Sequence, residues 1–301
     1  MEITVRVPGS CGELLQGELQ GEPFLVTCPI GCYTTVHVSD ALAGIHGLGR
    51  KSLMALEKTL TSLGKEEFPW GIRLESSLPR GKGMASSSAD IAATIAAVAL
   101  AFGYQPYWEE IMRLAVDIEP TDGVFCPGVV CINHMDGRML AGYRGLPAFR
   151  ISVYDTGGEV DTLRYHETLS VSPASRASAA AMETFKRGIK MHDEALLAAA
   201  ATASALANQQ LLYKEGLEEL LSFSRRLGAC GVNVAHSGTV IGVLWPADFA
   251  DSKLRQAEGC IGQRFPQLKF LLRSRLQSGG IWVATGSEGR WQELFAGQEE
   301  A

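Results

Sequence analysis

The fold of this chain is decided by the stretch Leu78-Pro79-Arg80-Gly81-Lys82-Gly83-Met84-Ala85-Ser86-Ser87-Ser88-Ala89-Asp90. It separates a strand pattern over residues 70–75 from an alanine-rich helical pattern over residues 89–102. Its glycines let the backbone fold closely around a ligand. Its three serines stand where the N-cap and first turn of the helix belong. Exposed backbone N–H groups and the helix dipole favour an anion at such a helix start.

The charges and hydroxyls of this loop indicate which anion it suits. Arg80 and Lys82 add positive charge beside the helix start, and seryl hydroxyls can ligate Mg²⁺. We therefore expect a nucleoside triphosphate site, and an ordinary glycine-rich turn with a serine cap is the alternative. The loop is neither a Walker A motif nor a dinucleotide fingerprint, because Ser86 stands where the latter needs its third glycine.

Strand and helix patterns alternate through both halves of the chain. Strands are predicted over 2–7, 24–28, 32–38, 70–75, 129–132, 149–155, 230–235, 239–245 and 281–285, and helices over 50–63, 89–102, 107–116, 173–190, 193–211, 215–227 and 249–263. This alternation predicts an α/β or α+β protein. Because Gly142, Gly145 and Pro147 lie close together, we expect two domains, 1–147 and 148–301.

Composition excludes several classes of protein. With 46% apolar and 20% charged residues, the 301-residue chain is not fully disordered. Its net charge of −6 argues against general nucleic-acid binding. The longest apolar run, 91–102, is too short to span a membrane, and the first residues lack a signal-peptide pattern. We expect a cytoplasmic protein with no nucleic-acid or membrane partner, whose seven cysteines are reduced.

Three segments carry a resemblance to a known family. The run from Pro79 to Ala89 resembles the Pro-x-x-x-Gly-Leu-Gly-Ser-Ser-Ala phosphate loop of the GHMP kinases, with Met84 for Leu and Ala85 for Gly. Residues 7–17, Val-Pro-Gly-Ser-Cys-Gly-Glu-Leu-Leu-Gln-Gly, resemble the first motif of that family, with serine in place of its usual Lys or Arg. Residues 234–239, Val-Ala-His-Ser-Gly-Thr, resemble a shortened third motif.

Together with Glu-Pro-Thr-Asp-Gly at 119–123, these segments are most similar to the branch that phosphorylates L-threonine in cobalamin biosynthesis. The resemblance implies a two-domain α+β fold with the nucleotide site in a cleft between the domains. It implies ATP and Mg²⁺ as cofactors and L-threonine O-3-phosphate as the product, for the aminopropanol arm of cobalamin. A small molecule is thus the expected partner, and a homodimer is left open.

The resemblance also assigns residues to roles. Asp122 is the expected catalytic base toward the acceptor hydroxyl, and a plain turn aspartate before glycine is the alternative. The expected phosphate-binding residues are Pro79, Arg80, Gly81, Lys82, Gly83, Met84, Ala85, Ser86, Ser87 and Ser88. Ser87 and Glu119 are the expected Mg²⁺ ligands. The expected substrate-binding residues are Gly12, Glu13, His236 and Ser237, with the Glu13 carboxylate pairing with a substrate ammonium.

Other functions stay open at this stage. A homoserine kinase or another small-alcohol kinase would carry the same loop, and so would an ATP-consuming decarboxylase of the same fold. A ligand-binding protein without catalysis is a third alternative, which the serine run and Asp122 disfavour. Loop composition also makes Asp161 and Thr162 candidates for substrate contact.

Overall fold

The structure is a computed structural model that describes residues 1–158, 175–286 and 289–296. Its strands are β1 (Glu2–Leu19), β2 (Glu22–Ser39), β3 (Ile45–His46), β4 (Gly71–Ser76), β5 (Val129–Ile132), β6 (Met139–Tyr143), β7 (Arg150–Asp155), β8 (Gly231–Val234), β9 (Val240–Trp245), β10 (Lys269–Arg275), β11 (Trp282–Thr285) and β12 (Gln292–Glu293). Its helices are α1 (Arg50–Ser62), α2 (Ser86–Ala101), α3 (Trp108–Val116), α5 (Ser175–Met191), α6 (Glu194–Asn208), α7 (Leu217–Arg226) and α8 (Asp251–Arg264). The mixed helix and strand class is confirmed.

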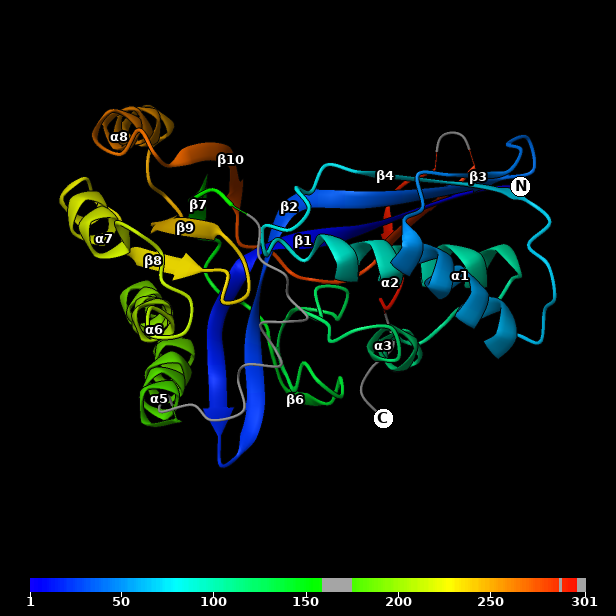
Figure 1. Cartoon of the computed structure of the whole chain (residues 1–301), viewed down its shortest axis with the longest axis horizontal. Coiled ribbons are helices and arrows are strands. Elements are labelled where there is room, and N and C mark those ends of the chain that lie inside the picture. The colour runs from blue at the N-terminus through cyan, green and yellow to red at the C-terminus, as the bar shows by residue number, and fades with distance from the viewer. Residues whose placement is uncertain (159–174, 287–288, 297–301) are drawn as a thin grey trace.

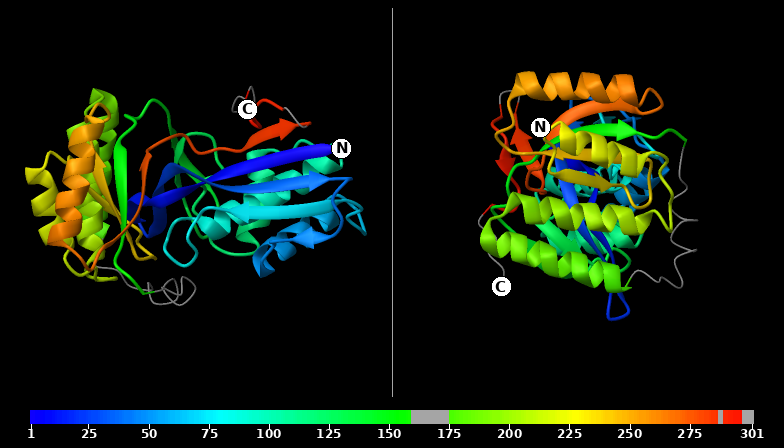
Figure 2. Two further views of the ribbon diagram at one scale, coloured as in Figure 1. Left: turned by 90° about the horizontal axis from the view of Figure 1, so that it is seen from above. Right: turned by 90° about the vertical axis from the view of Figure 1, so that its left-hand side faces the viewer.

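One sheet passes through both halves of the molecule, in the strand order β10-β7-β9-β8-β1-β2-β4-β3. β1 and β2 pair antiparallel along almost their whole length, with register shifts between Pro8 and Gly9 and again between Ser10 and Leu15. Within the second irregular stretch, Glu13 pairs with Val234 of β8. Bulges re-aim side chains and often lie next to active sites. Figures 1 and 2 show this β1–β2 ribbon running from the half that holds α1–α3 to the half that holds α5–α8.

Helix α2 lies in the core of the first half because small side chains let it approach the sheet closely. All of its residues from Ser88 to Ala99 are buried, and it contacts β1, β2, α1 and α3. In the second half, α5 and α6 pack on β1, and α6 also packs on β8. A second core surrounds the fully buried Trp245 and includes apolar residues of α7 and α8. Burial of these apolar side chains is the main force that holds each half together.

The first two strands differ from the sequence prediction in their extent. The predicted break at Pro29 and Gly31 does not occur, since β2 is one strand of 18 residues. Proline is tolerated there because Pro29 faces the irregular part of β1, opposite Ser10, where the regular ladder is interrupted. β1 likewise continues to Leu19 instead of ending at residue 7. Strands β3, β6, β10 and β12 were not predicted.

The predicted domain boundary between residues 147 and 148 falls in a segment without regular structure, between β6 and β7. It stays a prediction. Among the described residues, no helix combines the length and apolar character that crossing a membrane requires. All seven cysteines are free, and five of them are buried.

Candidate active site

The phosphate loop enters α2 through a left-handed backbone. Gly81 and Gly83 have φ angles of 69° and 76°, and Ala85, the N-cap residue, has a φ of 56°. The helix begins at Ser86, three residues earlier than predicted, and no side chain caps it. The three serines therefore occupy the first turn instead of capping it. The N-terminal N–H groups of a helix lack partners within the helix, so this end of α2 suits an anion.

The three motifs of the sequence meet around this loop. From the first motif, the N–H groups of Ser10 and Gly12 donate to the carbonyls of Met84 (3.0 Å) and Gly83 (3.2 Å). From the end of the third motif and the start of β9, the N–H groups of Thr239 and Val240 donate to the carbonyl of Lys82 at 3.0 and 3.2 Å. Backbone hydrogen bonds thus hold the loop from both halves of the molecule.

Three glycines make this meeting possible. A Cβ on Gly83 would lie 2.3 Å from the Cβ of Ala235, and one on Gly238 would lie 2.4 Å from the Cα of Gly83. Gly12 has a φ of +55°, and a Cβ there would lie 2.4 Å from the backbone N of Ala235. Side chains at these positions would push the loop and the third motif apart.

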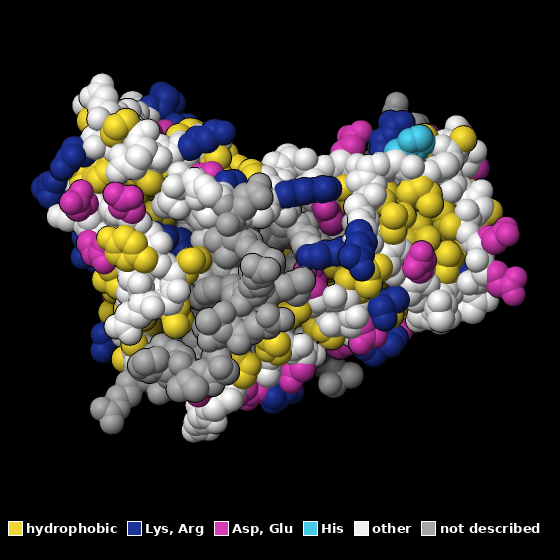
Figure 3. Space-filling model, in the orientation of Figure 1, with side chains coloured by type: hydrophobic (Ala, Val, Ile, Leu, Met, Phe, Trp, Pro, Cys, Tyr) yellow, Lys and Arg dark blue, Asp and Glu magenta, His cyan; other side chains and the backbone are white. Residues whose placement is uncertain are grey.

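A cavity of about 400 Å³ opens where the helices α1 and α2 begin. It is lined by Gly49, Arg50, Lys51, Ser52, Arg80, Gly81, Gly83, Met84, Ala85, Ser86, Ser87, Ser88, Asp90, Glu119, Pro120, Asp122 and Ser237. The N-cap of α1, Gly49, is among them, so two helix N-termini face one space. In Figure 3, Lys and Arg side chains gather near the middle of the face shown. The cavity therefore combines cations and backbone donors suited to phosphates.

One carboxylate in the cavity is held between a hydroxyl and an ammonium. The Ser87 hydroxyl donates to Oε1 of Glu119, and the Lys51 ammonium donates to Oε2 of the same carboxylate. Glu119 is 8% exposed, so its charge needs such partners. Two oxygen donors, the Ser87 hydroxyl and the Glu119 carboxylate, thus lie together at the start of α2. This donor set fits Mg²⁺, which binds one or two protein oxygens and completes its shell with phosphate and water.

The candidate base is positioned by the next serine. The Asp122 backbone N–H donates to the Ser88 hydroxyl at 3.2 Å, and that hydroxyl donates to Oδ2 of Asp122 at 3.4 Å. Burial, together with the negative charges of Glu13 and Glu119, raises the pKa of Asp122 to about 7, against the lowering effects of the Ser88 hydrogen bond and the Lys51 charge. A carboxylate with a pKa near neutrality is suited to accepting a proton.

The two loop cations have carboxylate partners. Arg80 lies 3.6 Å from Asp90, whose other oxygen accepts a hydrogen bond from Thr34 at 2.6 Å. Burial raises the pKa of Asp90, against the opposite effects of that hydrogen bond and of Arg80. Lys82 lies 2.9 Å from Asp155 of β7. The Lys82 ammonium is thus directed to the second half of the molecule, and Lys82 does not line the cavity.

The Asp155 carboxylate contacts both the phosphate loop, through Lys82, and the third motif, through Thr239. It accepts a hydrogen bond from the Thr239 hydroxyl at 2.6 Å, and Lys82 also donates to the carbonyl of Gly158 at 2.6 Å. Burial raises the pKa of Asp155, but the bonds from Thr239 and Lys82 outweigh it and the pKa is lowered. The second half therefore contributes a negative charge directly beside the phosphate loop.

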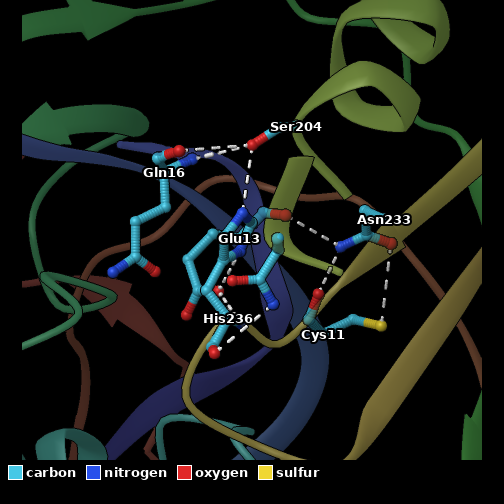
Figure 4. Close-up of polar contacts among 7 residues, drawn as sticks. Cys11, Glu13, Gln16, Ser204, Asn233 and His236 are labelled. Carbon is cyan, nitrogen blue, oxygen red and sulfur yellow. Dashed lines mark hydrogen bonds and ion pairs between the residues drawn. The ribbon is translucent and has the colours of Figure 1, made fainter. Parts of the chain in front are cut away.

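Two of the candidate substrate residues, Glu13 and His236, belong to a buried chain of polar contacts, shown in Figure 4. Glu13 Oε2 accepts the backbone N–H of His236 at 2.9 Å and lies 3.0 Å from its Nδ1. His236 Nε2 lies 3.0 Å from the Ser204 hydroxyl of α6. The Asn233 side chain donates to the carbonyls of Cys11 and Glu13, which fixes the irregular part of β1.

Most of the predicted site residues come together. Arg80, Gly81, Gly83, Met84, Ala85, Ser86, Ser87, Ser88, Glu119, Asp122 and Ser237 line the cavity, whereas Glu13 and His236 lie in the buried chain beside it. Asp161 and Thr162 lie outside the described residues. Sequence reasoning missed Lys51 and Asp155, because a lysine in a helical pattern and an aspartate at a strand end carry no signal of a distant partner.

The chain is similar in sequence to known proteins. A family model described as the GHMP kinases N terminal domain matches residues 50–128. An L-threonine kinase of Salmonella typhimurium is 32% identical over 288 residues, which cover 91% of this chain and 93% of that protein. An L-threonine kinase of Citrobacter freundii is 34% identical over 242 residues, which cover 79% of this chain and 84% of that protein.

Solved structures share the fold at low sequence identity. A homoserine kinase from Cytophaga hutchinsonii has a TM-score of 0.69 at 19% identity, covering 94% of this chain and 97% of that one. A mevalonate kinase from Methanococcus jannaschii has a TM-score of 0.69 at 14% identity, covering 92% and 98%. These two similarities show the fold alone, since such folds host different acceptors.

Proposed function

The chain belongs to the GHMP kinases, and from this premise we propose that it transfers the γ-phosphoryl group of ATP to the side-chain hydroxyl of L-threonine. Two relatives that span most of the chain bear the name of that activity. The observation that supports the proposal most is the position of Asp122. Its carboxylate lines the same cavity as the first-turn serines of α2, so a base and an anion site lie together.

The reaction assigns a task to each part of the cavity. The phosphate loop and the start of α2 bind the triphosphate, and Arg80 neutralises part of its charge. Asp122 accepts the proton of the acceptor hydroxyl as that oxygen forms its bond to the γ-phosphorus. The bond between the γ-phosphorus and the β–γ bridging oxygen breaks, and ADP leaves with that oxygen.

Ser87 and Glu119 are the proposed protein ligands of Mg²⁺. When bound, the ion would neutralise charge on the phosphate oxygens. The contact between Glu119 and Lys51 has a consequence for this site. If a cation were bound to the Glu119 carboxylate, the Lys51 ammonium in the lining of the same cavity would become available to a phosphate oxygen.

The acceptor is proposed to bind beside Asp122, toward the first and third motifs. Glu13 is the proposed partner of the amino-acid ammonium, because its buried carboxylate acts electrostatically on Asp122. Gly12, His236 and Ser237 complete that side. We further propose that the product serves the aminopropanol arm of cobalamin biosynthesis. The proposed location of the protein is the cytoplasm, and a homodimer is the assembly to test.

The decisive measurement is ADP release from MgATP by the purified protein with a panel of acceptors. The panel holds L-threonine, D-threonine, L-serine, L-homoserine, mevalonate and galactose. Turnover that strongly prefers L-threonine supports the proposal. A preference for L-homoserine would make L-homoserine the acceptor instead of L-threonine. ATP binding without turnover on any acceptor would indicate a ligand-binding protein instead of an enzyme.

A further inference from the structure

The segment between α6 and α7 places a lysine in the protein interior. Lys214 is 2% exposed, and within the described structure its Nζ atom has no hydrogen-bond partner. Buried polar groups are nearly always paired, and a buried ammonium without a partner is costly. Such a group calls for an explanation, and an anionic ligand that supplies the missing partner is one.

The backbone of Lys214 is fixed from both sides by one amide side chain. The Lys214 N–H donates to Oε1 of Gln209 at 2.7 Å, and Nε2 of Gln209 donates to the Lys214 carbonyl at 3.0 Å. The base of the side chain is therefore held in place before any ligand binds. Preorganisation of this kind reduces the entropy lost on binding.

The position of Lys214 relates it to the proposed acceptor site. Asn208, at the end of α6, donates to the carbonyl of His236 at 3.5 Å, which joins this part of the chain to the third motif. Burial lowers the pKa of Lys214 to about 8, while the charge of Glu13 raises it. Glu13 also acts on Asp122. The Glu13 carboxylate thus interacts electrostatically with both a buried ammonium and the candidate base.

A carboxylate and an ammonium in one buried region complement a zwitterion. We propose that Lys214 binds the α-carboxylate of the amino-acid acceptor while Glu13 binds its ammonium. This inference rests on the proposed function and adds a specificity-determining residue to it. The anion concerned is the acceptor and not the nucleotide, because Lys214 is absent from the lining of the phosphate cavity.

The test compares Lys214→Met with wild-type protein and with Lys253→Met, which removes an exposed lysine of α8. Calorimetry gives the Kd of L-threonine, and steady-state kinetics give KM and kcat. We expect Lys214→Met to raise the Kd and KM for L-threonine on the order of a hundredfold, since the loss of one buried charged partner has large effects. The KM for ATP should stay within about threefold, and Lys253→Met should match wild type.

A second acceptor tests whether Lys214 recognises the α-carboxylate of L-threonine. L-threoninamide keeps the hydroxyl and the ammonium but replaces the carboxylate with a neutral group. Wild-type protein should prefer L-threonine over L-threoninamide by on the order of a hundredfold, and Lys214→Met should lose most of this preference. Lys214→Arg, which keeps the charge, should retain it. An unchanged preference in Lys214→Met would overturn the assignment.

Thermal unfolding separates this role from a structural one. Removal of an unpaired buried charge should leave the Tm unchanged or raise it, whereas a structural lysine would give a lower Tm. If Lys214→Met does not fold, Lys214 is structural and the assignment fails. If Lys214→Met phosphorylates L-threonine with the turnover and KM of wild type, the role of Lys214 is rejected and the proposed function stands. Wild-type protein that neither binds nor phosphorylates L-threonine rejects the proposed function, and this role with it.

Discussion

The Ser88 hydroxyl accepts the backbone N–H of Asp122 at 3.2 Å and lies 3.4 Å from one oxygen of the Asp122 carboxylate. The first turn of α2 therefore does two things. It presents its N-terminus to the cavity, and it fixes the candidate base beside that N-terminus. Because both functions come from consecutive residues of one buried helix, the distance between the phosphate site and the base is set by rigid structure.

Replacement of Asp122 by asparagine tests its role as the base. The amide keeps the shape of the side chain but cannot accept the proton, so we expect kcat to fall about 10²- to 10⁴-fold. The Kd of ATP should change little. Steady-state kinetics and nucleotide binding by calorimetry provide the check. A folded variant with near-normal turnover would remove Asp122 from the mechanism.

The raised pKa of Asp122 predicts a specific pH dependence. A general base acts in its ionised form, so activity should rise with pH as a group with a pKa near 7 loses its proton. We expect kcat/KM for L-threonine, measured at saturating MgATP, to rise between about pH 6 and about pH 8. Asp122→Asn should lack this rise. If Asp122→Asn showed the same rise of kcat/KM with pH, the titrating group would be one other than Asp122.

Removal of the Ser87 hydroxyl tests the proposed Mg²⁺ site. Ser87→Ala takes away one of the two oxygen donors that lie together at the start of α2. We expect low turnover at ordinary Mg²⁺ concentrations and partial recovery as Mg²⁺ is raised, because a missing ligand weakens metal binding. Ser252→Ala, on the exposed side of α8, is the matched control. A Ser87→Ala enzyme with the Mg²⁺ dependence of wild type would contradict the assignment.

Two glycines with nearly the same φ angle allow the cost of backbone strain to be measured apart from the cost of steric crowding. Gly83 and Gly103 have φ angles of +76° and +75°, but a Cβ on Gly103 meets no atom within 4 Å. Gly103→Ala should lower the free energy of unfolding by about 1–2 kcal/mol through backbone strain alone. Gly83→Ala should cost roughly 1–3 kcal/mol more, because the new Cβ collides with Ala235. Urea unfolding measures both, and equal losses would show that the loop and the third motif are less tightly packed.

Local patterns in the sequence predicted the parts of the site that depend on local structure. The phosphate loop and the helix after it follow from residue types and spacing that reflect backbone geometry. Asp122 was assigned by the family resemblance, because an aspartate before glycine is locally an ordinary turn residue. The strand lengths were missed for a physical reason. Pro29 indicates a break in most strands, and only its partner, the irregular part of β1, makes it acceptable within β2.

The residues that the sequence did not predict act through partners far along the chain. Lys51 contacts Glu119, and Asp155 contacts Lys82, which the sequence had assigned to phosphate binding. A lysine in a helical pattern or a loop is normally solvated, so its sequence neighbours carry no sign of these contacts. Lys214 is a stronger case, since this lysine between α6 and α7 is buried in the folded chain and nothing in its sequence neighbours indicates that burial. Tertiary packing creates these features.

The continuous β1–β2 ribbon limits how this protein can be divided. All of β1 precedes residue 148, yet α5, α6 and β8 in the second half pack against it or pair with it. A chain cut between residues 147 and 148 would leave the C-terminal fragment with an open edge at β8 and uncovered apolar helix faces. That fragment would therefore need the other one to fold, so the two pieces would work only as a complementing pair.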